Sequence, residues 1–221
     1  MQIKTKFEKL ERVGVIDVGS NSVRLVVFDG AARSPAYFFN EKVLCGLGRG
    51  ISEAGVLHPV GRKRALSAME RFAALATSFD VQSLEAVATA AVRDATDGLA
   101  FCAEVKVKTG IKIRIISGPE EARYSAQGVL LGRPEATGLV SDLGGASMEL
   151  ATIEGGAVGT CLSSPLAPLR LMDMERNVDK YIRKSLKELQ NQICGEHKTL
   201  HLVDGSYRAI ANIYLARRSY P

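Results

Sequence analysis

Two short units with the same pattern constrain the fold of this chain most. Each has an apolar run that ends in aspartate, a small tip containing glycine, and a second apolar run. The first unit is VGVIDVGSNSVRLVVF from Val13, and the second is GLVSDLGGASMELATI from Gly138. Apolar runs joined by turn-forming residues are typical of β-hairpins. The sequence therefore predicts two hairpins, each with an Asp-x-Gly tip.

Helical and strand patterns alternate along the rest of the chain. Apolar spacing and turn residues predict the following elements: a helix over roughly 60–79, a strand over 83–89, a helix capped by Asp97 that ends at Gly110, a strand over 111–116, a helix that begins near Pro119, a mostly helical region after Thr160 with an amphipathic segment over 173–193, a strand over 200–203 and a helix over 206–216. Interleaved helices and strands predict an α/β fold.

A break in the pattern at Gly132, Arg133 and Pro134 indicates a domain boundary. We expect an N-terminal domain over 1–131 and a second domain over 132–221.

Composition excludes several classes of protein. Hydrophobic residues make up 46% of the 221-residue chain and charged residues 24%, as in ordinary globular proteins. No apolar run approaches the roughly 18 residues that indicate a membrane span, and the first twelve residues lack the apolar stretch of a secretory signal. We therefore expect a cytoplasmic protein with no membrane partner. The four cysteines are scattered without paired spacing, which argues against a disulfide framework.

The net charge of +5 favours anionic partners. The sequence has no cluster of aromatic and basic residues of the kind that would indicate a specific nucleic-acid partner.

The first tip contains the residue types that bind phosphate. Gly19 lets the backbone approach a ligand closely, and successive amides with the Ser20 and Ser22 hydroxyls can surround phosphate oxygens. The same residue types also form ordinary tight turns, so this tip alone decides nothing.

The recurrence of the pattern in the second tip favours phosphate binding over an ordinary tight turn. Two Asp-x-Gly tips facing each other across a cleft would form a two-sided phosphate clamp, in which Asp17 and Asp142 hold a magnesium ion.

Four ordered motifs resemble those of the exopolyphosphatase and guanosine pentaphosphate phosphohydrolase (Ppx/GppA phosphatase) family, within the actin, hexokinase and Hsp70 superfamily. VGVIDVGSNSVRLVVF resembles the family's first phosphate loop and SDLGGASMEL its second. Between them, VATAAVRDATD resembles the family's second segment and ISGPEEAR its glutamate motif.

The resemblance implies an actin-like (ribonuclease H-like) fold of mixed sheets with flanking helices, in two domains. It implies a Mg²⁺-dependent hydrolase that removes the terminal phosphate of polyphosphate or converts guanosine pentaphosphate to tetraphosphate. The chain ends at Pro221, short of the family's usual second domain, so we expect a truncated second domain that an added segment or a homodimer would complete.

The resemblance also assigns roles to residues. Glu121 would orient and deprotonate the attacking water, and Asp17, Asp142 and Glu149 would contact the metal. The phosphate-binding residues would be Gly19, Ser20, Asn21, Ser22, Arg24, Thr89, Arg93, Gly144, Gly145, Ala146 and Ser147. Without the family pattern, Glu120 and Glu121 would be interpreted as acids favoured in the first turn of a helix.

Some residues depart from the family pattern. Ala146 and Met148 stand where the second loop usually has glycine and often threonine, and Ala167 and Pro168 replace an expected glycine. These departures keep open two alternatives: a catalytically weak regulator that binds polyphosphate or a nucleotide, and an ATP-dependent member of the same superfamily.

A zinc site is a minor alternative. It would use Cys194, His197, His201 and Asp204, but no second cysteine pair supports it.

Overall fold

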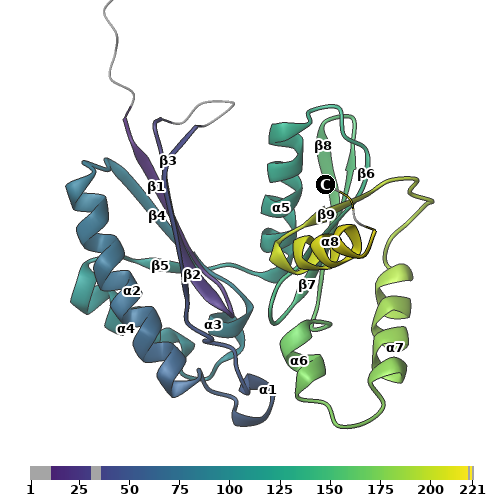
Figure 1. The fold of residues 1–221 in the computed structure, drawn as a ribbon, viewed down its shortest axis with the longest axis horizontal. Coiled ribbons are helices and arrows are strands. Elements are labelled where there is room, and N and C mark those ends of the chain that lie inside the picture. Colours follow the sequence, from purple (N-terminus) through teal and green to yellow (C-terminus); the bar gives the residue numbers. More distant parts are fainter. Residues whose placement is uncertain (1–10, 31–35, 219, 221) are drawn as a thin grey trace, which may run out of the picture.

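The chain forms two units, each built on its own sheet (Figure 1). The computed structural model describes residues 11–30, 36–218 and 220. One sheet has five strands in the order β3-β2-β1-β4-β5, and the other has four in the order β8-β7-β6-β9. Most of the opening segment that bears on secretion, residues 1–10, lies outside the described residues.

The first unit combines its sheet with helices along one face. Its elements are β1 Val13–Val18, β2 Ser22–Phe28, β3 Tyr37–Leu44, α1 Ile51–Ala54, α2 Pro59–Ser78, β4 Ser83–Ala88, α3 Ala90–Asp94, α4 Gly98–Thr109 and β5 Ile113–Ile115. Strands β1 and β2 are antiparallel, whereas β1 pairs with β4, and β4 with β5, in parallel.

Alternate side chains of the first hairpin form the core of this unit. Ile16, Val18 and Leu25 are fully buried and belong to the same cluster as Phe72 of α2 and Phe101 of α4. Their period of two places the neighbouring residues, Asp17 among them, on the opposite face of the sheet. The predicted first hairpin is confirmed, and the face away from the helices is left for the polar residues of the tip.

The second unit begins with a helix. Its elements are α5 Gly118–Gly132, β6 Gly138–Leu143, β7 Met148–Glu154, β8 Ala157–Ser164, α6 Pro168–Met172, α7 Val178–Gln190, β9 Leu200–Val203 and α8 Gly205–Arg217. Strands β6, β7 and β8 form an antiparallel meander, and β9 adds to β6 in parallel. The second predicted hairpin is therefore confirmed as β6 and β7.

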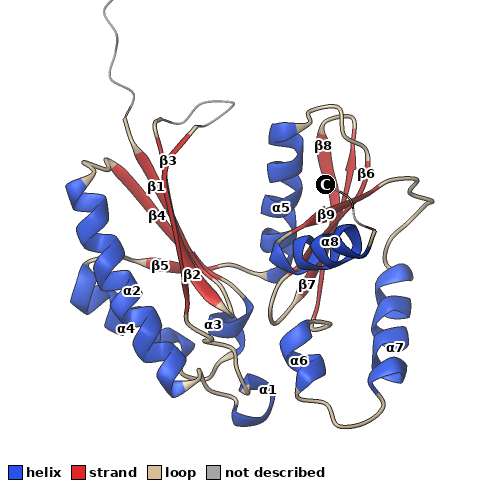
Figure 2. Ribbon diagram, viewed as in Figure 1, coloured by secondary structure: helices blue, strands red, loops and turns tan. Residues whose placement is uncertain are grey.

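Helix α5 shares its core with the second sheet. Ala122 and Ala126 are buried in one cluster with Val140, Ala151 and Ile153, and α5 lies on the side of this sheet that faces the first unit (Figure 2). The sequence-based boundary at 131/132 falls at the C-terminal end of α5, which runs to Gly132, so it places almost all of this helix in a different domain from the strands against which it packs.

Two local predictions differ from the structure. The region after Thr160 continues as strand β8 to Ser164 before helices begin, because β8 completes its pairing with β7. Asp97 occupies the N-cap position of α4, but its side chain does not cap the helix. Its carboxylate instead accepts a hydrogen bond of 2.9 Å from the Leu57 amide and thereby ties the loop before α2 to α4.

The C-terminal elements of the second unit are the least buried. Helix α8 has no buried residue among those described, and Ile210 and Ile213 are each 59% exposed. On β9, at the edge of the sheet, Leu200 and Leu202 are each 54% exposed. None of the described helices is long and apolar enough to cross a membrane.

These burial differences predict unequal effects on stability. Phe72→Ala removes a fully buried ring from the core, so we expect it to lower the free energy of unfolding by about 3–5 kcal/mol. Ile210→Ala changes an exposed side chain and should cost no more than about 0.5 kcal/mol. Urea denaturation of both variants measures the difference.

A loss at Ile210 as large as that at Phe72 would contradict this prediction. It would show that another surface, such as a second copy of the chain, covers α8 in solution, and the midpoint would then depend on protein concentration.

Candidate active site

A cleft of about 630 Å³ lies between the tips of the two hairpins. The β1–β2 tip forms one wall, and the β6–β7 tip forms the other together with the turn between β9 and α8. Most of the residues named from the sequence line it: Asp17, Gly19, Ser20, Asn21, Ser22, Arg24, Thr89, Glu121, Asp142, Gly144, Gly145 and Ser147.

The two tips approach each other closely at Gly145. A Cβ atom on Gly145 would lie 3.3 Å from the Cβ of Ser20 and 3.7 Å from that of Asn21. The Gly145 carbonyl also accepts a hydrogen bond of 3.0 Å from the Leu169 amide, which anchors the second tip to α6. Glycine at this position therefore lets the two walls meet at the base of the cleft.

Backbone amides at both tips are unsatisfied. Within the described part of the chain, the amides of Ser20 and Asn21, and those of residues 144–147, donate to no protein acceptor. Successive amides without a protein acceptor form concavities that bind anions. The two tips therefore present donors suited to phosphate oxygens.

The start of α5 gives its two glutamates different roles. Ser117 and Glu120 form a capping box, in which the Ser117 amide donates to Glu120 at 2.8 Å, and Arg114 also pairs with Glu120 at 3.0 Å. The interpretation of a first-turn acid that stabilises the helix thus fits Glu120. Glu121 instead lies in the cleft, with 18% of its side chain exposed.

The environment of Glu121 favours its protonated form. Burial raises the pKa of this carboxyl to about 8, and the nearby Glu149 and Asp142 carboxylates add to the rise. Arg93 opposes the rise through an ion pair of 3.1 Å. A carboxyl whose pKa lies near neutrality is suited to general acid or base catalysis.

Glu149 is the most deeply buried acid of the site. Its side chain is only 1% exposed. Its Oε1 accepts a hydrogen bond of 2.8 Å from Ser163, whereas its buried Oε2 has no partner among the described residues. Burial raises its pKa to about 7, against the hydrogen bonds from Ser147 and Ser163. A cation or a hydrogen-bond donor would stabilise this unpaired oxygen.

Asp142 and Asp17 end the strands that lead into the tips. Burial raises the pKa of Asp142, although Ser125 donates a hydrogen bond to its Oδ2. Asp17 opens onto the cleft. Loss of hydration among the surrounding residues raises the pKa of its carboxyl to about 6, and the Asp204 and Asp142 carboxylates add to the rise.

Neighbouring carboxylates with raised pKa values attract a divalent cation, so the donors present fit Mg²⁺. No group of three or more acidic, histidine or cysteine side chains in the described chain is arranged to hold a metal by itself. Mg²⁺ commonly uses only one or two carboxylates, with substrate phosphates completing its coordination.

The structure adds residues that the sequence reasoning did not assign to the site. Asp204 and Arg208 from the β9–α8 region and Lys42 from β3 line the same cleft. Asp204 has a φ of 81°, uncommon for a residue other than glycine. An Asp-Gly pair follows the apolar LHLV run, as an aspartate and a nearby glycine follow the apolar runs of the two tips, and this signal could have identified Asp204.

Three of the predicted site residues do not line the cleft. Arg93 pairs with Glu121 and donates to the Ile116 carbonyl at 3.1 Å, and Glu149 lies beneath the surface. Ala146 faces a separate small cavity beside α3 and α6.

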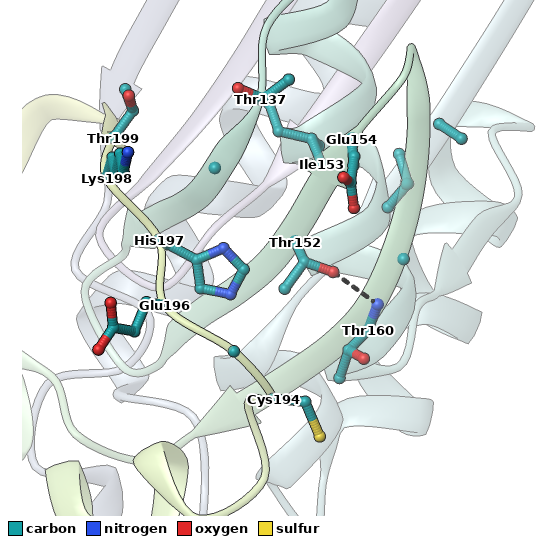
Figure 3. A pocket seen from close by; sticks show the side chains of 15 residues that line it. Thr137, Thr152, Ile153, Glu154, Thr160, Cys194, Glu196, His197, Lys198 and Thr199 are labelled. Carbon is teal, nitrogen blue, oxygen red and sulfur yellow. Dashed lines mark hydrogen bonds between the residues drawn. The ribbon is translucent and has the colours of Figure 1, made fainter.

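The residues weighed for zinc are also dispersed. Cys194 and His197 border a surface cavity of about 570 Å³ at the other end of the second sheet, where Thr152 accepts a hydrogen bond of 2.9 Å from the Thr160 amide (Figure 3). Asp204 lies in the cleft instead.

The opposite pKa shifts of Glu121 and Glu120 predict opposite pH dependence of stability. The pKa of Glu121 is raised from 4.5 to about 8, so the stability that its protonated form contributes is complete below pH 4.5 and is lost as the pH rises toward 8. Glu121→Gln should flatten this decline, by at most about 1.4 kcal/mol per pH unit. Thermal unfolding between pH 5 and 8 measures it.

Glu120→Gln is the matched control. The pKa of Glu120 is lowered, mainly by hydrogen bonds from Ser117, so its contribution is present above pH 4.5 and is lost as the pH falls. Equal slopes in wild type and Glu121→Gln between pH 5 and 8 would contradict the buried environment of Glu121.

Solved structures of known proteins resemble this fold. An exopolyphosphatase from Cytophaga hutchinsonii superposes with a TM-score of 0.86 at 25% identity, over 95% of this chain and 72% of that one. The Aquifex aeolicus member of the Ppx/GppA protein family gives a TM-score of 0.75 at 25% identity, over 93% and 70% of the two chains. These similarities confirm the predicted α/β fold of the actin-like type.

Curated relatives agree at the level of sequence. Exopolyphosphatase 1 of Mycobacterium tuberculosis is 31% identical over 163 residues, covering 72% of this chain and 47% of its own length. Exopolyphosphatase 2 of the same species is 32% identical over 175 residues, covering 74% and 54%. The chain thus spans about half the length of these relatives.

The family model described as the Ppx/GppA phosphatase family matches residues 26–220. The match starts within β2, beyond the first tip, and includes Glu121 and the second tip. The motif order, the cleft between the two hairpin tips and this match over most of the sequence agree, and we conclude that the chain belongs to the Ppx/GppA phosphatase family.

Proposed function

We propose that this chain binds inorganic polyphosphate between its two hairpin tips and releases the terminal phosphate by hydrolysis. The observation that carries the proposal is the set of unpaired amides on both tips, beside the buried carboxyl of Glu121. The named activity of the mycobacterial relatives supports polyphosphate as the substrate.

The two tips would hold the phosphate chain from opposite sides. The free amides and the Ser20 hydroxyl would donate to its oxygens, and Arg24 would contribute positive charge at the cleft wall. Phosphoryl transfer depends mainly on positioning and electrostatic stabilisation, which fixed amide donors provide.

Mg²⁺ is part of the proposal. Asp17 and Asp142 would contact the ion and Glu149 its water ligands, since the Asp142 carboxylate raises the pKa of both Asp17 and Glu149 and one oxygen of Glu149 is unpaired. Bound there, Mg²⁺ supplies positive charge that neutralises phosphate oxygens.

Glu121 would accept the proton of the attacking water. Its raised pKa makes it a stronger base than an ordinary glutamate, and Arg93 orients its carboxylate through Oε2. In this view Arg93 acts on the base rather than on the phosphate predicted for it, because its side chain does not line the cleft.

Substitution of Glu121 tests the proposed reaction. Glu121→Gln keeps the shape of the side chain but removes its basicity, so phosphate release from polyphosphate should fall by roughly 10²- to 10⁴-fold. Polyphosphate affinity should be retained, because the tips are unchanged. Colorimetric phosphate release and calorimetric titration measure the two quantities.

Glu120→Gln is again the control, since Glu120 lies in the capping box and outside the cleft. It should reduce the rate less than about twofold, because it does not contact the reacting groups. Equal effects at both positions would remove Glu121 from the reaction and favour a regulator that binds polyphosphate without hydrolysing it.

The same assay separates the possible substrates. Release from guanosine pentaphosphate would assign a conversion to tetraphosphate to this cleft, whereas release from ATP in preference to polyphosphate would favour an ATP-dependent function.

A further inference from the structure

A row of charged side chains crosses the first sheet at the cleft. Asp17 of β1 is paired with Arg24 of β2, and Arg24 is paired with Lys42 of β3. Directly paired residues of neighbouring strands lie on the same face of a sheet. Because β3 is the edge strand, the row leads from the first tip to the rim of the cleft.

The basic residues of this row are available for a ligand. Within the described chain, Lys42 has no carboxylate within 4.0 Å, in contrast to Arg62, Arg71 and Arg114, which are each ion-paired. Glu41, the neighbour of Lys42, pairs with Arg71 instead. Arg71 thus takes the neighbouring carboxylate, and the ammonium group of Lys42 is left open to the cleft.

Arg24 is held in place without losing its binding groups. Its Nε donates a hydrogen bond of 2.8 Å to Asn40 on β3. In the described part of the chain its two terminal amino groups have no protein acceptor. A guanidinium fixed through Nε presents these groups as a fork that matches a phosphate.

The length of the row indicates a polymeric ligand. Adjacent strands lie about 4.8 Å apart, so the backbone positions of Asp17 and Lys42 are separated by about 10 Å. A single phosphate bound between the tips cannot span this distance, whereas a chain of linked phosphates can. Arg208 of α8 lines the opposite wall of the same cleft and adds to its positive charge.

We infer that Lys42 forms a subsite for the distal phosphates of a linear polyphosphate chain, with Arg24 between it and the tips. This subsite makes affinity increase with chain length. The inference rests on the proposed function, because it assigns the direction in which the substrate leaves the reaction centre.

Calorimetric titration of the whole chain with pyrophosphate and with long-chain polyphosphate tests the inference. The Glu121→Gln background prevents turnover of the ligand. Adding Lys42→Gln should weaken long-chain affinity by about 3- to 10-fold and leave pyrophosphate affinity unchanged. The loss should shrink at high ionic strength, because salt screens exposed charges.

Lys106→Gln is the matched control, since Lys106 is an exposed lysine of α4, on the helical side of the first sheet. It should leave both affinities unchanged. An equal loss for the two ligands, or no loss with long-chain polyphosphate, would overturn the Lys42 subsite.

The controls also separate this inference from the proposed function. If the chain with Lys42 intact binds neither ligand, the proposed function fails and the subsite fails with it. If that chain binds long polyphosphate and the wild type hydrolyses it, but Lys42→Gln behaves the same, only the subsite is wrong.

Discussion

The close contact of the two hairpin tips is the constraint on which the rest of the site depends. Gly145 has no side chain, so the second tip can lie against Ser20 and Asn21 of the first. This contact brings the ends of β1 and β6 together, although their cores are separate. The strand-end aspartates and the free amides of both tips therefore face one cleft, and α5 brings Glu121 to it from the second unit.

The buried acids and the exposed cations of the site lie on different parts of the fold. Burial raises the pKa of Glu121, Glu149 and Asp142, each of which lies on or beside α5 and the second sheet. Lys42 and Arg24 lie along the first sheet toward the rim. Unpaired buried groups destabilise a fold, and natural proteins retain them mainly at functional sites. This arrangement suits an anionic ligand that binds together with Mg²⁺. The oxygens of the ligand would meet the cations, and Mg²⁺ would neutralise the acids.

Local patterns predicted much of this structure. Both hairpins, α2 and the start of α5 followed from apolar spacing, turn residues and Pro119, because these signals depend on neighbouring positions. The roles of Glu120 and Glu121 could not be separated in this way, since the capping box and the cleft are distinguished only by the packing of α5. Lys42 was missed because its place depends on the register of β3, an edge strand that has no buried residue and that the apolar patterns did not predict.

The central claim is that both tips bind one phosphate chain, and Gly145→Val tests it most directly. Valine would push against Ser20 and separate the walls. We expect polyphosphate affinity, measured by calorimetry, to fall at least about tenfold, with a smaller effect on the midpoint of unfolding. Gly128→Val on α5, where an added Cβ meets nothing within 4 Å, should bind as the wild type does. A folded Gly145→Val variant with unchanged affinity would contradict a two-sided site.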